Sequence, residues 1–503
     1  MPAQLTTRAQ VNGYRFLLRR LDHALVRRDV RMLHDPMRAQ LRSLIVGAVL
    51  ALLVVAGAAI MSFIRPQGSI GNSNIVMGKE SGALYVVVQD EDDESKKTLH
   101  PVLNLASARL ITGSNEKPNS VKDSKLNTLP RGPLLGIPGA PAALPGSSQG
   151  DRSRWTLCDT VQLSNSGGAA SSAGATTTAI AGELELTDRM KKVDNDTALL
   201  VRNGGKTYLI YEGKRAEIDP TNSVIRRSLD ISGQQARPIS TGLLGAATAT
   251  PPLAAPTIDR AGEPGPGRLS DVPVGGIIRL SSLGDSEAVE HYVVLADGVQ
   301  RVSEFTAELI RNDDSQGMSQ PKSVPPDLLD GIPVVHSLPT DDFPTTKPKI
   351  VSAEQNPVAC IEWTKAGRAG LQQSDAAEGP ADRASVSILV GTRLPLPESA
   401  VPVSLATADN TGNRIDSVYV RPTTGEFVRV TGVEPGSPRR DSLFYVADNG
   451  VRYGVPDLDT ADVLGLGRSP HLAPWAIVGQ LVPGPTLDKR EALVSHDSVA
   501  QGG

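Results

Sequence analysis

The feature that most constrains this chain is an uncharged run of 22 residues, Ser43 to Ile64, between Arg42 and Arg65. At about 1.5 Å of rise per residue, a helix of this length spans roughly 33 Å, which matches a bilayer hydrocarbon core of about 30 Å. A core helix rarely stays wholly apolar beyond about 14 residues. The run therefore predicts one transmembrane helix, with residues 1–42 and 65–503 on opposite sides of a membrane.

The charges on either side of this run predict its orientation. Residues 1–42 hold nine arginines and three aspartates, whereas residues 65–94 hold one arginine and one lysine against six carboxylates. Because basic residues stay on the cytoplasmic side, we expect a cytoplasmic N-terminus and an exported body. The alternative is a signal peptide, whose apolar region is about 7–15 residues long, cleaved near Gly57-Ala58-Ala59. We favour an uncleaved anchor in the inner membrane.

Both cysteines of the chain, Cys158 and Cys360, lie in the exported body, each three residues from a tryptophan. In an oxidising compartment a lone pair of cysteines predicts a structural disulfide. Closing a loop of about 200 residues would stabilise the fold by roughly 5 kcal/mol in the chain-entropy model. Two free buried thiols, which behave as small hydrophobic groups, are the alternative.

Residues 8–32 carry a helical pattern in which apolar side chains recur every three or four positions. This stripe consists of Tyr14, Leu17, Leu18, Leu21 and Leu25, while Arg15, Arg19 and Arg27 mostly occupy other faces. The helix could lie on the anionic inner leaflet, or dock its stripe into a cytoplasmic domain of a partner. A basic tail that only sets topology is the third possibility. The apolar stripe favours docking.

Composition and turns predict the fold of the body. The chain has 48 glycines and 38 prolines but only 3% aromatic residues, which favours short strands and extended connections over long helices. Turns containing Asn-Gly or Asp-Gly between apolar strands are strong hairpin signals. We expect four hairpins, the first interrupted by an acidic stretch: Ala83–Val88 with Thr98–Val102, Ala198–Val201 with Tyr208–Ile210, His291–Val294 with Asp297–Val299, and Leu443–Val446 with Asn449–Val451.

Because an isolated hairpin is unstable in water, these units must pack on one another or on a common core. We therefore expect an α+β protein in which four small repeats surround a central, mainly β domain, with a core hairpin formed by Val418–Val420 and Phe427–Val430. The predicted segments are 1–42, a cytoplasmic basic amphipathic helix; 43–64, the transmembrane helix; 65–145, a linker and the first repeat; 146–196 and 339–436, the two parts of the central domain; 197–250, the second repeat; 251–338, a connector and the third repeat; 437–487, the fourth repeat with a proline-rich extension; and 488–503, a disordered tail.

The sequence contains one lookalike of a nucleotide-binding loop, Gly205-Lys206-Thr207. A phosphate-binding loop needs glycine at position 200, which is Leu200, and a helix after the lysine, where a strand is predicted. Lys206 is therefore only a weak candidate for an ATP site.

Other signals of chemistry are equally sparse. The seven histidines show no metal-ligand spacing, and no Gly-x-Ser-x-Gly elbow occurs. The three tryptophans, which could serve sugar binding, fit core packing better. The basic residues concentrate in residues 1–42, so nucleic acid is not an expected partner. We expect no catalytic, cofactor or metal site.

Four motifs carry a resemblance to a known family. They are GYRFLLRRLDHALVRRDVRM at 13–32, SGALYV at 81–86, LHPVLNLASARL at 99–110 and PRGPLLGIPGAP at 130–141. These motifs closely resemble the EccB family, the single-span core component of actinobacterial type VII (ESX) secretion machinery. The resemblance covers essentially the whole chain.

The resemblance implies a structural subunit that assembles with EccC, EccD and EccE in the inner membrane, forms periplasmic EccB–EccB dimer contacts and contacts the mycosin protease. It looks nearest the paralogue that serves PE/PPE protein export. Family members also carry an ATPase label, for which this sequence offers no Walker-type loop. A periplasmic nucleotide hydrolase and a peptidoglycan-binding module are the alternative functions.

Overall fold

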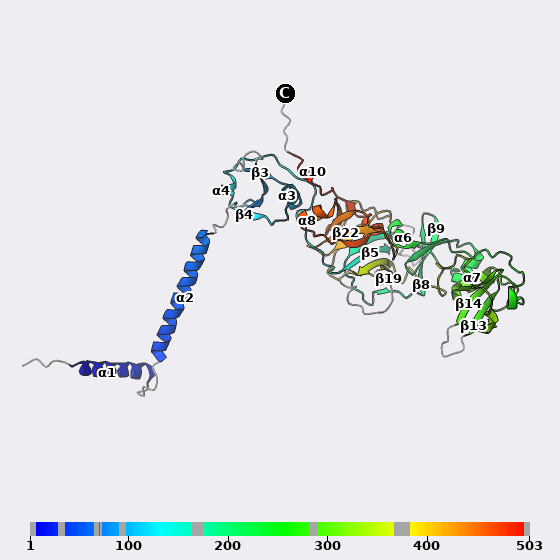
Figure 1. Cartoon of the computed structure of the whole chain (residues 1–503), viewed down its shortest axis with the longest axis horizontal. Helices are drawn as coiled ribbons and strands as arrows, with labels where there is room; N and C mark the ends of the chain where they lie inside the picture. Colours follow the sequence, from blue (N-terminus) through cyan, green and yellow to red (C-terminus); the bar gives the residue numbers. More distant parts are fainter. Residues whose placement is uncertain are drawn as a thin grey trace, which may run out of the picture.

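The computed structural model describes residues 7–28, 36–64, 70, 73–89, 97–162, 175–281, 289–366 and 383–496. Within them the chain forms a mixed α+β protein. Two N-terminal helices, α1 (Arg8–Arg27) and α2 (Pro36–Ile64), precede a body that contains five β-sheets. Figure 1 shows these helices apart from the body, which is elongated.

Helix α2 contains the predicted transmembrane run and extends beyond it toward the N-terminus. It begins at Pro36, whose fixed φ suits the first turn of a helix. Residues Leu41–Met61 have a mean hydropathy of 2.8 and form the one candidate span among the described residues. Their side chains are exposed in the protein itself, as expected for a helix that faces lipid.

Four of the five sheets share one strand order. In each, three strands form an antiparallel meander, a helix follows, and a fourth strand pairs in parallel with the first strand of the meander. The elements are β1 (Ile75–Gly78), β2 (Leu84–Gln89), β3 (Lys97–Pro101), α3 (Leu105–Thr112) and β4 (Asn119–Val121) in the first sheet; β8 (Thr197–Asn203), β9 (Lys206–Tyr211), β10 (Lys214–Ile218), α5 (Ser223–Leu229) and β11 (Arg237–Pro238) in the second; β13 (Ile277–Ser281), β14 (Val289–Leu295), β15 (Gly298–Val302), α7 (Glu304–Asp313) and β16 (Lys322–Val324) in the third; and β22 (Gly425–Thr431), β23 (Leu443–Ala447), β24 (Val451–Val455), α8 (Leu458–Val463) and β25 (His471–Pro474) in the fourth.

A second short helical turn and a further parallel pairing complete the pattern. In the second and fourth sheets, α6 (Thr241–Ala246) and α9 (Trp475–Val478) lead to the short strands β12 (Thr248–Ala249) and β26 (Val482–Pro483). These strands pair in parallel with the third strand of their meander. In the first and third sheets, α4 (Asp123–Leu126) and η2 (Pro326–Leu329) lead to parallel bridges at the equivalent place.

All four predicted strand pairs form, but they are not all equivalent. The pairs β2–β3, β14–β15 and β23–β24 join the second and third strands of a meander, whereas β8–β9 joins the first and second. In the second sheet, the hairpin equivalent to the other three is β9–β10, which turns at Glu212-Gly213. Both turn residues have positive φ, as a type I′ turn requires.

The fifth sheet is central and mixed, and the disulfide lies in its middle. Its seven strands run in the order β20 (Val403–Ser404), β21 (Ser417–Val420), β6 (Ala175–Ala181), β5 (Arg152–Val161), β18 (Val358–Ala366), β19 (Ser385–Gly391) and β7 (Met190–Lys192). Cys158 on β5 lies directly opposite Cys360 on β18, and the structure joins them. Trp155 and Trp363 form the equivalent cross-strand pair on the other face, because side chains alternate along a strand.

Shared hydrophobic cores fix the order of the sheets along the body. Phe305 and Leu309 of α7 pack into the core of the second sheet. The second, central and fourth sheets share one large core, and helix α3 of the first sheet packs into the core of the fourth. The order is therefore third, second, central, fourth and first, as the colours along the body in Figure 1 show.

The predicted core hairpin is wrong. Strand β21, which contains Val418–Val420, pairs with β6 and β20 in the central sheet, whereas β22 pairs with β23 and β25 in the fourth. The chain turns between them at Thr423, whose φ is 62°, and passes from one sheet to the other. The first strand of the fourth sheet thus lies inside the range expected for the central domain.

The predicted disordered tail is wrong for residues 488–496; residues 497–503 lie outside the described part of the chain. Helix α10 (Lys489–Ala492) packs on α3 with Ala492 fully buried. Beyond it, the His496 backbone N–H donates to the Leu134 carbonyl over 3.0 Å, and its ring contacts the Gly136 carbonyl. The C-terminal segment therefore ties the fourth sheet to the first.

We expect a stop after Leu487 to loosen the first sheet, since it removes α10 and at least two hydrogen bonds. Hydrogen exchange of the α3 amides should then report an opening free energy lower by about 2–3 kcal/mol. A stop after His496 is the matched control, which should leave the protection of α3 unchanged. Equal protection in the two truncated chains would contradict this role of the segment.

Candidate functional site

The predicted docking surface lies on α1. Thr7 and Gln10 form a capping box at its start, and Arg28 ends it in the left-handed conformation. Tyr14, Leu17 and Leu21 are 65%, 60% and 59% exposed, and Leu18 and Leu25 are also exposed. Arg15 and Arg19 are exposed on other faces, and the side chain of Arg27 lies outside the description. Contiguous apolar surface of this kind marks a contact site for protein or membrane.

Lys206, the weak nucleotide-site candidate, begins strand β9 directly after a two-residue turn. Gly204 and Gly205 both have positive φ, and Lys206 pairs with Asn203 across the hairpin. The Lys206 ammonium lies 2.8 Å from a carboxylate oxygen of Glu217 on β10. A hairpin does not direct a row of backbone N–H groups at a phosphate as a helix N-terminus does. This arrangement resembles an ordinary exposed ion pair.

The described residues contain no group of three or more His, Cys, Asp and Glu side chains that could hold a metal ion. The most perturbed acid in the central sheet is Asp159, whose burial raises its pKa to about 6. Its carboxylate accepts from the Ser240 backbone N–H at 2.6 Å and the Thr177 hydroxyl at 2.8 Å. These contacts join the central sheet to the start of α6 and give Asp159 a structural role.

A charge also lies buried beside this carboxylate. The Arg237 guanidinium donates to the Asn356 and Pro357 carbonyls over 3.1 Å and 2.8 Å, and burial lowers its pKa to about 10. Asp416 accepts from the backbone N–H groups of Thr177 and Asn410, each over 2.7 Å. Each of these buried charges has hydrogen-bond partners, as their burial requires.

We expect Asp159→Asn to change how stability depends on pH. The pKa of Asp159 is higher in the folded state than the usual 3.8, so the folded protein holds the proton more tightly and wild-type stability falls as pH rises from about 4 to 6. The variant lacks this loss. Its free energy of unfolding relative to wild type should therefore rise by about 3 kcal/mol between pH 4 and pH 7.

Exposed Asp219 provides the control for that titration. The Thr221 hydroxyl and backbone N–H lower the pKa of Asp219, so its contribution to stability is lost as pH falls. Denaturant unfolding of Asp219→Asn should show a difference from wild type of the opposite sign. A free-energy difference between Asp159→Asn and wild type that does not change with pH would contradict the raised pKa of Asp159.

Two features escaped sequence reasoning. Asn104 caps α3, and its side-chain amide donates to the Ile137 carbonyl over 2.9 Å. The Ser107 hydroxyl accepts from the Ile137 backbone N–H over 2.8 Å. Two of the motifs quoted above are therefore in contact. Trp475 is not a core residue: it is 45% exposed and stacks on Phe444, with the Arg452 guanidinium 5.1 Å from its ring centre. Aromatic and arginine side chains of this kind often dominate protein contacts.

The fold and these surfaces define a protein with one candidate membrane span among its described residues and a large body built from several sheets. The family model described as "Type VII secretion system ESX-1, transport TM domain B" matches residues 3–501. The chain therefore belongs to the EccB family of type VII secretion proteins.

The sequence similarity to known relatives extends over nearly the whole chain. The chain is 39% identical over 508 residues to "ESX-3 secretion system ATPase EccB3" of Mycolicibacterium smegmatis, covering 98% of this chain and 91% of the relative. It is 38% identical over 502 residues to "ESX-5 secretion system ATPase EccB5" of Mycobacterium tuberculosis, covering 98% and 94%.

Solved structures agree with this membership. A chain of an intact ESX-5 inner membrane complex matches with a TM-score of 0.69 at 35% identity, covering 100% of this chain and 98% of that one. A chain of the periplasmic assembly of the ESX-5 complex matches with 0.66 at 36% identity, covering 88% and 100%. A chain of an EccB3 dimer from the ESX-3 core complex matches with 0.67 at 36% identity, covering 84% and 100%.

Proposed function

We propose that this chain is a structural subunit of a type VII secretion complex, which links the export channel in the inner membrane to a periplasmic assembly. The observation that carries the proposal is the uncovered apolar stripe of α1, placed directly before the candidate span. The solved relatives, which come from an inner membrane complex, a periplasmic assembly and a dimer, support it.

The proposed topology has a cytoplasmic N-terminus and a periplasmic body. Nine arginines precede the apolar run that begins at Ser43, and each cytoplasmic arginine favours this orientation. The disulfide in the central sheet supports an oxidising compartment for the body. We also propose that the four sheets of equal strand order are repeats of one unit, arranged on both sides of the central sheet.

In the proposed assembly, α1 docks on a cytoplasmic domain of EccC, EccD or EccE, and the exported repeats contact a second copy of the chain and the mycosin protease. Deleting residues 1–32 should therefore prevent recovery of the other subunits with this chain from detergent-solubilised membranes. The body should keep its fold, because its cores contain no residue of α1. Unchanged recovery would refute docking through α1.

A second candidate function is nucleotide hydrolysis, which the word ATPase in the relatives' names favours. It predicts ATP hydrolysis by the purified full-length chain that Lys206→Ala abolishes. The exposed ion pair of Lys206 with Glu217 supports the structural function instead, and under it we expect no cofactor. Binding to peptidoglycan is the third alternative, and it predicts that the chain sediments with cell walls.

A further inference from the structure

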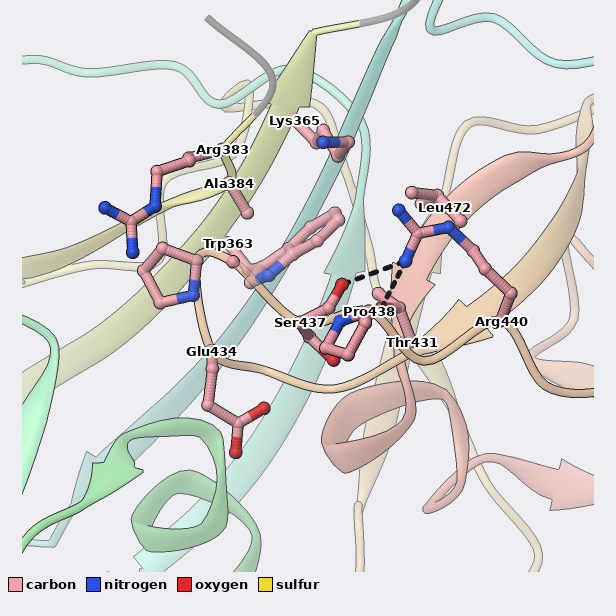
Figure 2. Close-up of a pocket in the computed structure, with 12 residues that line it drawn as sticks. Trp363, Lys365, Arg383, Ala384, Thr431, Glu434, Ser437, Pro438, Arg440 and Leu472 are labelled. Atoms are coloured by element: carbon pink, nitrogen blue, oxygen red, sulfur yellow. Dashed lines mark hydrogen bonds between the residues drawn. The ribbon is translucent and has the colours of Figure 1, made fainter. Parts of the chain in front are cut away.

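A small cavity lies where the central sheet meets the fourth sheet. Its volume is about 270 Å³, and the loop after β22 closes one side of it. Figure 2 shows the indole of Trp363 among the lining residues, with the loop that carries Glu434 and Ser437 in front of it. Ala384 and Leu472 add apolar lining. The cavity is large enough for a chemical group of one or two residues rather than a drug-sized molecule.

The lining contains a buried hydrogen-bond donor without an acceptor. Trp363 is only 1% exposed, and its Nε1 has no hydrogen-bond partner among the described residues. Most buried polar groups in proteins have a partner, and an unsatisfied one costs about 1–3 kcal/mol. Because so little of the side chain is exposed, an acceptor for this N–H must reach the bottom of the cavity.

The charges around the cavity favour an anion. Among the described residues that line it, the guanidinium groups of Arg383 and Arg440 outnumber the one carboxylate, that of Glu434. One nitrogen of the Arg440 guanidinium donates to the carbonyls of Ser437 over 2.9 Å and Arg439 over 2.7 Å, which holds the side chain at the cavity. The other two guanidinium nitrogens have no hydrogen-bond partner among the described residues. The planar donors of arginine match the two oxygens of a carboxylate.

We propose that this cavity binds the carboxylate of a peptide, which accepts a hydrogen bond from Trp363 Nε1. The positive charges of Arg383 and Arg440, which lie on opposite sides of the indole in Figure 2, attract this carboxylate to the cavity. The carboxylate of Glu434 disfavours a doubly charged phosphate more than a singly charged carboxylate. The apolar lining accommodates a small side chain beside the charged group. This site is independent of the docking of α1.

The test is ligand-observed NMR titration of the full-length chain in detergent. The probe is N-acetyl-alanyl-valine as the free acid, and its C-terminal amide is the uncharged reference. N-acetyl-aspartate N-methylamide separates a side-chain carboxylate from a terminal one. We expect saturable binding of at least one acid, weakened by added salt, and no comparable binding of the amide.

Two tryptophan variants distinguish this site from non-specific attraction. Trp363→Phe keeps an aromatic, though smaller, side chain but removes the N–H. It should weaken binding about tenfold or more, because a hydrogen bond to a charged group is lost. Trp155→Phe is the matched control: its Nε1 is also buried without a partner, but Trp155 does not line the cavity. It should bind like wild type.

Arg383→Gln serves as a variant at the exposed rim that leaves the core packing intact, and it should also weaken binding. Three results would overturn the proposal: equal binding of acid and amide, unchanged affinity of Trp363→Phe, or equal losses in the two tryptophan variants.

Discussion

Replacing Leu17 and Leu21 together by glutamate is expected to reduce recovery of the assembled complex more than tenfold. Both side chains are about 60% exposed on the same stripe of α1, so the change leaves the folded chain intact. In a docked helix these leucines would be buried, and fully burying each contributes about 1.5–3 kcal/mol. Placing two charges in such an interface without partners costs more still.

The matched control is Asn12→Glu with Val26→Glu, which adds the same two charges to the same helix away from the stripe. Both double variants should be inserted and folded like wild type, since seven tenths or more of the side chain of Val26 is already exposed. Affinity purification of membranes from cells that carry each variant, scored by the recovered partner subunits, provides the measurement. Equal recovery with the two double variants would exclude the stripe as a docking surface.

Replacing Cys158 and Cys360 together by alanine is expected to lower the free energy of unfolding of the central sheet by about 5 kcal/mol. The disulfide joins residues 202 positions apart, and in the chain-entropy model such a loop restricts the unfolded chain by roughly that amount. Both residues are fully buried, so loss of packing adds to the effect. This is a large fraction of the stability of most domains.

Guanidinium unfolding followed by tryptophan fluorescence can measure this loss. A Trp475→Phe background confines the signal to Trp155 and Trp363, the cross-strand pair of the central sheet. Wild type treated with reductant is the control, since the reductant breaks the disulfide while both sulfur atoms remain in the core. Peptide mapping without reduction should find Cys158 linked to Cys360. A loss below about 1 kcal/mol would contradict a stabilising role for the disulfide.

The sequence predicted the elements that short stretches of neighbouring residues determine. The apolar run predicted α2, and the Asn-Gly and Asp-Gly turns predicted hairpins that the structure confirms. The cysteine pairing followed from their number and compartment. In each case the information lies in a few adjacent residues or in a single possible pair.

The errors concern contacts between distant segments. The partner of Val418 on β21 is Ala179 on β6, a parallel pairing across about 240 residues that no local pattern encodes. The turn at Thr423 resembles a hairpin turn although it joins strands of different sheets. Helix α10 has four residues, too few to show helical periodicity, and becomes ordered because α3 covers it. The cavity beside Trp363 likewise arises from four segments that meet only in the fold.

The assembly role is tested most directly by native mass spectrometry of the complex extracted in mild detergent. A structural subunit of this kind should give particles that contain at least two copies of this 52.9 kDa chain together with other membrane subunits. Recovery of the chain only as a monomer of 52.9 kDa, under conditions that keep the other subunits together, would contradict it.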